Sequence, residues 1–183
     1  MISRRQRFTR HPLPLRAALF AGLAAGTAEV FWVSAYATAT GADALPIARE
    51  VAASVIPGLG AHAAAPSVGI GIHFALSAAL AIAFVSALWR ACGGRPAPAL
   101  IALAAVSVLA LVWSGNFLLL LPSLNPAFLE QMPRAATFAS KLLFGLTMAW
   151  MLGRNAGVAS CSSATPLPRI RQPRPSSSDL AAR

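Results

Sequence analysis

The stretch "VGIGIHFALSAALAIAFVSALW", residues 68–89, decides the fold because it contains no Asp, Glu, Lys or Arg. A helix needs about twenty consecutive apolar residues to cross the hydrocarbon core of a bilayer. A second charge-free run extends from Pro96 to Leu129. Charged residues make up 11% of the 183 residues, against roughly 25% in soluble domains. The sequence therefore predicts an integral membrane protein.

Working outward from this run, the same length criterion predicts three further spans. The four expected spans are residues 17–36, 68–89, 99–121 and 135–152. We expect an all-α, polytopic four-helix transmembrane bundle over residues 17–152, preceded by a basic N-terminal tail at residues 1–16. Residues 153–183 are rich in Pro, Ser and Arg and have little to bury, so a disordered basic tail is predicted.

The basic residues indicate the orientation of the chain. Most of the fifteen lie in the two tails and in the loop that holds Arg90 and Arg95. Because basic loops stay on the cytoplasmic side, both termini are predicted to be cytoplasmic, as an even number of spans requires. These arginines also suit anionic lipid headgroups. No aromatic residues are interleaved with them to stack on bases, so a nucleic-acid partner is not expected.

The N-terminus has a competing interpretation as a cleaved secretory signal. "SRRQRF" at residues 3–8 is similar to a twin-arginine signal, and "AYATA" at residues 35–39 offers small residues for cleavage. Glu29 interrupts the apolar region, however, and the distance to the cleavage site is long for a signal peptide. We therefore expect the first helix to be retained.

Two outer segments are expected to form short interfacial helices. In residues 43–58 the apolar residues Ala48, Val51, Ala52 and Val55 recur at helical spacing. In "NPAFLEQMP", residues 125–133, the asparagine is a natural N-cap and the following proline a natural first helical residue. These helices either cover the bundle as a lid or only connect the spans.

Each predicted span carries one conspicuous polar residue: Glu29, His73, Asn116 and Lys141. At 1.5 Å of rise per residue, each lies about 8–10 Å from the outer end of its helix. The four residues therefore form a predicted polar layer at one depth. We expect this layer to face the interior, because ionisable residues inside a membrane usually face the bundle interior and pair with each other.

Small residues mark the faces on which the layer lies. Glu29 follows the GxxxG pair Gly22 and Gly26 on one face, and His73 and Lys141 each lie in a row of small residues at spacing four. Glu29 and Lys141 have opposite charge at matching depth, so we expect them to pair. Lys141 is also the only lysine of the chain, and lysine can lose its proton when buried.

The layer has two possible roles. Its members can bind one another and fix the helix register, or they can form a proton or ion site in which His73 changes charge near neutral pH. The sequence contains no HExxH motif, nucleophile elbow, phosphate loop or carboxylate cluster. We therefore expect no enzyme activity, no catalytic residues, no cofactor and no metal.

Four stretches carry a resemblance to a known group of proteins: "AGTAEVFW", "IGIHFALS", "NFLLLLPSLNPAF" and "SKLLFG". Together they resemble a family of small bacterial inner-membrane proteins with four helices. The resemblance covers roughly residues 21–150. It implies a four-helix fold and a location in the bacterial inner membrane, and it implies no activity.

Taken together, the sequence favours a structural or interaction component of the membrane, bound to other membrane proteins or to itself. The alternative is a small proton- or ion-coupled transporter or channel subunit that uses the polar layer. One copy has few polar residues with which to line a continuous aqueous path. Polarity continues inward only through scattered serines such as Ser77 and Ser107, which favours the structural role.

Overall fold

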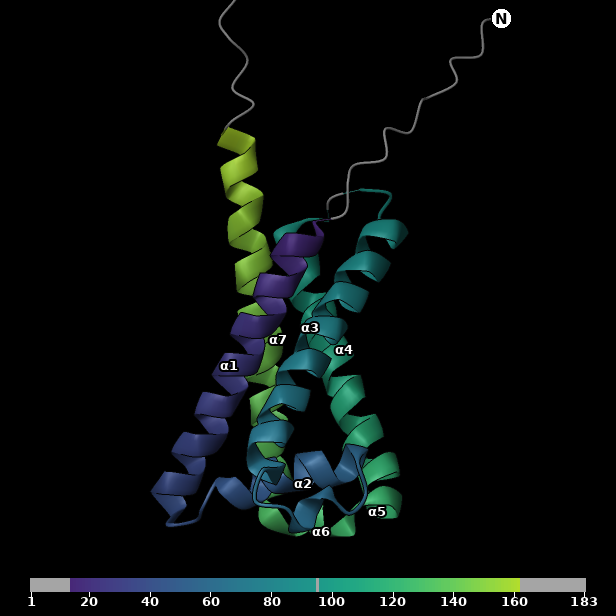
Figure 1. The fold of residues 1–183 in the computed structure, drawn as a ribbon. Coiled ribbons are helices and arrows are strands. Elements are labelled where there is room, and N and C mark those ends of the chain that lie inside the picture. Colours follow the sequence, from purple (N-terminus) through teal and green to yellow (C-terminus); the bar gives the residue numbers. More distant parts are fainter. Residues whose placement is uncertain (1–13, 95, 162–183) are drawn as a thin grey trace, which may run out of the picture.

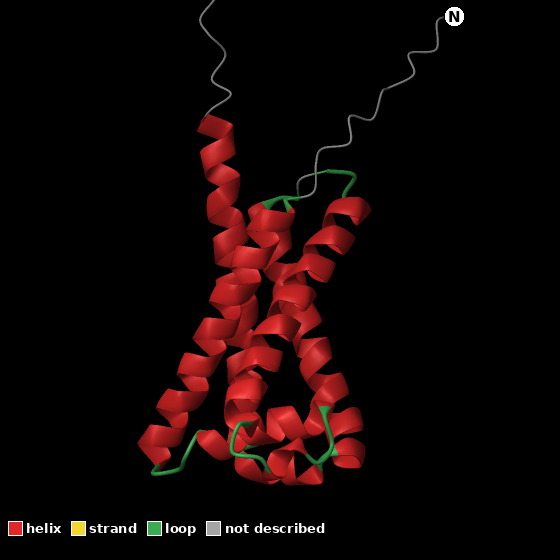
Figure 2. Cartoon of the chain, viewed as in Figure 1, coloured by secondary structure: helices red, strands yellow, loops and turns green. Residues whose placement is uncertain are grey.

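Four long helices dominate a computed structural model that describes residues 14–94 and 96–161, with side chains described as far as residue 154. The helices are α1 (Leu15–Thr40), α3 (Ala65–Ala91), α4 (Pro98–Ser114) and α7 (Arg134–Cys161) (Figure 1). The described residues contain helices and loops and no strand (Figure 2). The predicted all-α four-helix bundle is confirmed.

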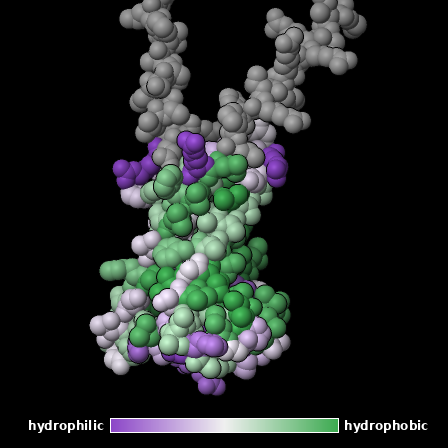
Figure 3. All heavy atoms as spheres, in the orientation of Figure 1, coloured by the Kyte–Doolittle hydropathy of each residue, from purple (hydrophilic) through white to green (hydrophobic). Residues whose placement is uncertain are grey.

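Each long helix is apolar and long enough to cross a bilayer, α4 together with the two short helices that continue it to Leu124. Figure 3 shows the corresponding surface, with an apolar band between two ends where hydrophilic residues gather. Because a soluble protein would bury such faces, this chain is a multi-pass integral membrane protein.

The order of packing differs from the order along the chain. Helix α1 packs against both α3 and α7, and α7 also packs against α4. All four helices meet in one apolar core near the end of the bundle where the described chain begins (Figure 1). We call this the basic end, defined by Arg16, Arg90 and Arg154. The largest fully buried side chains of this core are Ile101, Leu109, Val85, Phe144 and Met148.

Helices α1 and α3 approach closely because glycine replaces larger residues at their crossing. A Cβ atom on Gly22 would lie 2.7 Å from the Ser77 carbonyl oxygen, and one on Gly26 would lie 2.8 Å from Ser77 Oγ. Both distances are shorter than a van der Waals contact. The GxxxG pair predicted to mark a packing face is therefore the contact surface of α1 against α3.

The opposite end is covered by short helices, and we call it the capped end, defined by α2 (Leu45–Val55) and α6 (Pro126–Gln131) (Figure 1). A 3₁₀ turn, η1 (Leu59–Ala61), lies in the connection between α2 and α3. Helix α2 packs against α3 so closely that a Cβ atom on Gly69 would lie 1.8 Å from the Ala48 carbonyl oxygen. The two short helices predicted from the sequence are therefore packed across the bundle.

The face that α2 buries differs in part from the predicted one. Ala52 is buried as expected, but Val55 is exposed. Ile47 is buried instead and packs with Met132 and Ala136. The amphipathic pattern assumes a helix lying on lipid, whereas α2 is held among other helices, and those neighbours decide which side chains are covered.

Helix α4 changes its geometry near the capped end. It continues through a π-helical segment, η2 (Gly115–Leu120), into α5 (Leu121–Leu124). The Leu121 N–H donates to the Asn116 carbonyl, five residues earlier. Pro122 follows directly and has no N–H to donate, and a proline inside a helix disturbs the preceding turn in this way.

Helix ends extend beyond the predicted spans because hydrophobicity marks the bilayer crossing and not the end of the helical hydrogen bonding. The clearest case is α7, which continues past the predicted end at Leu152 to Cys161. Residues 153–161, assigned to the tail from the sequence, are therefore helical. The rest of the expected disordered tail, from residue 162, lies outside the described residues, as do residues 1–13 of the N-terminal tail.

Candidate functional site

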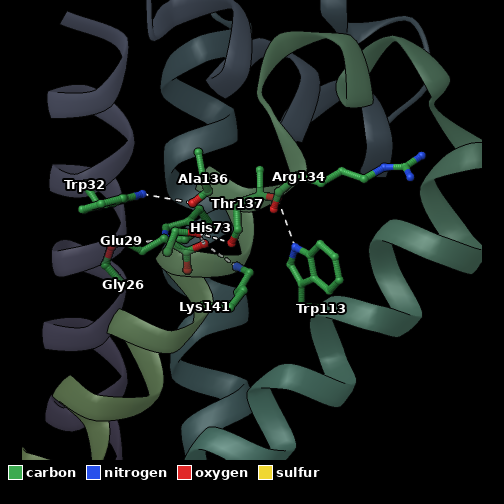
Figure 4. A network of polar contacts seen from close by, with 10 residues as sticks. Gly26, Glu29, Trp32, His73, Trp113, Arg134, Ala136, Thr137 and Lys141 are labelled. Carbon is green, nitrogen blue, oxygen red and sulfur yellow. Dashed lines mark hydrogen bonds and ion pairs between the residues drawn. The ribbon is translucent and has the colours of Figure 1, made fainter. Parts of the chain in front are cut away.

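Glu29 lies in the interior of the bundle, as predicted. Only 6% of its surface is exposed. The Lys141 ammonium of α7 donates to Glu29 Oε1 and forms a salt bridge with it (Figure 4). Ser140 Oγ lies 3.1 Å from the same oxygen and 2.7 Å from the Thr137 carbonyl oxygen, so its single hydroxyl hydrogen is shared between these two acceptors. The predicted pair is thus formed, and the Ser140 hydroxyl lies beside it.

The second oxygen of this carboxylate is different. Glu29 Oε2 is buried and has no hydrogen-bond donor among the described residues. Lys141 reaches the pair from a less buried position, with 21% of its side chain exposed. The pair therefore combines a deeply buried carboxylate with a cation that remains in part accessible.

His73, on α3, reaches α1 at Gly26, three residues before Glu29. Its Nε2 is 3.2 Å from the Gly26 carbonyl oxygen, and a carbonyl only accepts. Nε2 therefore carries the hydrogen in this bond, and Nδ1 is the nitrogen left for other contacts. The ring also lies edge-on to Phe74 at 5.6 Å between centroids. His73 thus joins α3 to α1 beside the ion pair and makes no hydrogen bond to Glu29 or Lys141.

Asn116 is not brought into this network. No hydrogen bond joins its side chain to Glu29, His73 or Lys141, and its residue is half-buried in the π-helical segment. The buried row of α4 consists of Ile101, Ala105 and Leu109, and it continues at Phe117 of η2. Asn116 directly precedes Phe117 in the chain, so it lies at the flank of the buried face.

Trp113 is the residue through which α4 joins the polar contacts. Its indole Nε1 donates to Thr137 Oγ1 at 3.0 Å, and Thr137 donates in turn to the Arg134 carbonyl at 2.8 Å (Figure 4). Trp32 makes a similar link from α1, with Nε1 donating to the Ala136 carbonyl at 3.0 Å. Both tryptophans attach a neighbouring helix to the first turn of α7.

Sequence reasoning missed Ser140 and Trp113, although each carried a signal. Ser140 begins a row at spacing four with Phe144, Met148 and Leu152, all of which are buried. It is the only polar member of that row. Trp113 stands midway between the buried Leu109 and Phe117 at helical spacing, but the sequence alone does not separate a tryptophan that anchors at the membrane interface from one that links two helices.

Buried polar side chains end about one helical turn from the polar layer on the side of the basic end. The buried polar or charged residues among those described are Glu29, Ser77, Thr137 and Ser140. Ser77 packs against Gly26, and further toward the basic end the buried side chains that the structure describes are apolar. Water has no polar groups to follow through this core.

A second polar cluster fastens the capped end. Asn125 Nδ2 donates to Glu50 Oε2 and to Ser54 Oγ, each at 2.9 Å, and Asn125 Oδ1 accepts from the Phe128 N–H at 3.2 Å. The predicted N-cap is therefore confirmed, and the same side chain also attaches α6 to α2. Arg49 donates to the Gly60 carbonyl at 2.7 Å and so holds the turn after α2.

Chemically, the layer can hold an ion pair, orient a histidine, join α1 and α4 to α7, and join α3 to α1. Within the described residues, no three side chains of His, Cys, Asp or Glu gather as a metal site would require. Comparisons with protein families, with curated proteins and with solved structures find no match to this chain. The resemblance to small four-helix inner-membrane proteins therefore stays a prediction.

Proposed function

We propose that this chain is a structural component of a bacterial inner membrane that acts by binding other membrane proteins, without catalysis. In this proposal both termini are cytoplasmic. Arg16, Arg90 and Arg154 share one end of the bundle, and basic residues are retained on the cytoplasmic side. The location and the family rest on the resemblance in sequence.

One observation supports this role above others: the side-chain donors of the polar layer bind acceptors within the chain, and the layer is followed by an apolar core. Its donors, the side chains of Lys141, Ser140, Trp113 and Trp32, reach acceptors within the chain. Buried polar contacts of this kind fix helix register more than they stabilise, since hydrogen bonds between membrane helices average about 0.6 kcal/mol. A rigid, self-contained bundle is suited to presenting its outer faces to a partner.

Exposed aromatic and leucine side chains supply those outer faces. On α1, Phe20 and Phe31 are 63% and 74% exposed, and on α4 Leu103 and Leu111 are 67% and 71% exposed. Lipid tails cover such faces in the absence of a partner. Partner binding should concern one of these faces, whereas lipid contact should involve all of them.

Site-specific photo-crosslinking tests the proposal. A photoreactive amino acid is placed singly at Phe20, Phe31, Leu103 and Leu111, and membranes are irradiated before solubilisation. We expect a discrete protein adduct from the positions of one helix and only lipid adducts from the other. Lipid adducts alone at all four positions would contradict a binding role.

The orientation has a separate test that uses a native cysteine. Cys92 is exposed in the loop at the basic end. In a Cys161→Ser background, a membrane-impermeant maleimide should label Cys92 only after the cells are opened. A cysteine placed at exposed Ala63, at the capped end, should react in intact cells. The reverse pattern would contradict cytoplasmic termini.

A second candidate function is proton or ion coupling, and one observation favours it. Glu29 Oε2 is buried without a donor beside His73 and a partly exposed Lys141, and ionisable residues inside a membrane often mark proton or ion pathways. Purified protein in liposomes with a pH gradient distinguishes the candidates. The structural role predicts a leak equal to that of empty liposomes, and coupling predicts a leak that His73→Ala abolishes.

A further inference from the structure

A groove lies between α4 and α7 at the basic end, away from the polar layer. Its volume is about 460 Å³, within the range of small-molecule sites. The lining residues are Pro98 and Ala102 of α4 and Leu146, Ala149, Trp150, Gly153 and Arg154 of α7. The groove is thus apolar along its length, and its described lining contains one cation, Arg154.

The cation stands at one end of the groove. Leu146 and Arg154 are eight residues apart on α7, which corresponds to about 12 Å along the helix. Arg154 is exposed, and its guanidinium lies over the Trp150 ring, 4.5 Å from the ring centroid. Stacking on an aromatic face holds the guanidinium plane and leaves its N–H edge free to bind a phosphate in bidentate fashion.

The shape and charge of this groove match an amphiphile. Its apolar part lies within the membrane-spanning length of α7 and its cation at the basic end. Pro98, the first residue of α4, lines the same groove, so the positive end of that helix dipole lies near Arg154. A second copy of the chain in parallel orientation would bring its own Arg16, Arg90 and Arg154 to this end, which charge repulsion disfavours.

We propose that the groove between α4 and α7 binds one anionic phospholipid, with an acyl chain along Leu146 and Ala102 and the phosphate on Arg154. This lipid site is independent of the polar layer and of the proposed protein partner. It differs from general attraction between basic tails and the membrane surface, because it requires both an acyl chain and one particular arginine.

Two variants test the contributions of the headgroup and of the acyl chain to binding separately. Arg154→Gln removes the cation and keeps the groove. Gly153→Leu fills the groove and keeps the cation, and it should fold because a Cβ atom at Gly153 meets no atom within 4 Å. Arg90→Gln is the matched control, since Arg90 is an exposed arginine of the same end that does not line the groove.

The test is native mass spectrometry of the full chain, purified in mild detergent and freed of lipid. The protein is titrated with phosphatidylglycerol, with phosphatidylcholine of the same acyl chains, and with glycerol 3-phosphate. We expect the wild type to bind phosphatidylglycerol best and glycerol 3-phosphate not at all. Arg154→Gln should weaken the binding of phosphatidylglycerol about fivefold, the size of one basic contact at an anionic surface. Gly153→Leu should weaken the binding of both lipids.

Several results would overturn the lipid site. Equal affinity of the wild type for the two lipids would remove the role of Arg154, as would an equal loss in Arg90→Gln. Full lipid binding by Gly153→Leu would remove the groove. Binding of glycerol 3-phosphate as tight as that of phosphatidylglycerol would indicate a phosphate site without an acyl chain. A dimer that Gly153→Leu converts to monomer would make the groove an interface between copies.

Discussion

The two ends of the bundle are held together by different interactions. At the basic end the four long helices meet directly, and side chains such as Leu109, Phe144 and Met148 fill the space between them. At the capped end α1 and α5 lie apart, and α2 and α6 occupy the space between them (Figure 1). There Asn125 and its hydrogen bonds fasten the short helices to each other.

Both kinds of interaction are expected of helices that associate in lipid. Lipid tails are as apolar as leucine, so membrane helices associate through close packing and hydrogen bonds instead of hydrophobic burial. The basic end relies on close packing, whereas the capped end combines close packing of α2 on α3 with the hydrogen bonds of Asn125. The Glu29–Lys141 pair lies between them, at the level where the long helices begin to separate. Each interaction should therefore fail separately when it is removed.

The largest effect should come from reversing one charge of the buried pair. Glu29→Lys or Lys141→Glu places like charges together, and disrupting a buried ion pair costs about 3–5 kcal/mol. The double variant restores opposite charges and should recover most of that loss. The measurement is unfolding by SDS titration in mixed micelles. A double variant as unstable as the worse single variant would show that the pair does not hold the helices.

Gly22→Val should disrupt the packing of α1 on α3 that holds the basic end together. Its Cβ would lie 2.8 Å from the Ala81 Cβ and even closer to the α3 backbone, so α1 must move away. Overpacking of this kind costs about 3 kcal/mol at the upper end of its usual range. Gly71→Val is the control, because a Cβ there meets no atom within 4 Å. Equal unfolding midpoints for the two variants would contradict close packing of α1 on α3.

Gly69→Ala should affect the capped end while sparing the core. The added methyl would collide with the Ala48 carbonyl, and we expect α2 to be displaced at a cost of about 2 kcal/mol. Hydrogen exchange should rise in α2 and stay unchanged in the core segments of α4 and α7. The matched control is Gly71→Ala, two positions further along α3. Protection of α2 equal to that in the wild type would contradict the close contact.

Asn125→Ala removes a cap and two contacts to α2 at once. A lost N-cap costs about 1 kcal/mol, so hydrogen exchange should increase in α6 and α2 with little change elsewhere. Asn125→Asp keeps the cap acceptor and removes the amide donor to Glu50, and it should therefore release α2 while α6 stays capped. If both variants left the two helices fully protected, the cluster would have no part in fastening the capped end.

Local features of the chain could be predicted, and contacts between helices were harder. Charge-free runs and the isolated Glu29 and Lys141 are visible in the sequence because a charge inside a membrane is costly wherever it lies. Asn116 was assigned to the layer from its depth, but depth does not fix the direction of a side chain. The groove at Arg154 depends on which helices become neighbours, and α4 and α7 are brought together only by the fold.

The smallest effects should come from substitutions at Trp113 and Asn116, which test which of the two residues connects α4 to the polar layer. Trp113→Phe keeps an aromatic ring against Phe117 and Phe138, which surround the indole, but removes the donor to Thr137. The loss should be about 0.6 kcal/mol, the average for a hydrogen bond between membrane helices. Thr137→Val also removes the bond to the Arg134 carbonyl, so its loss should be larger. The double variant should lose no more than Thr137→Val alone, because the bond between the two side chains is removed only once. Asn116→Ala should leave the SDS unfolding midpoint unchanged, and a larger loss there than in Trp113→Phe would return Asn116 to the layer.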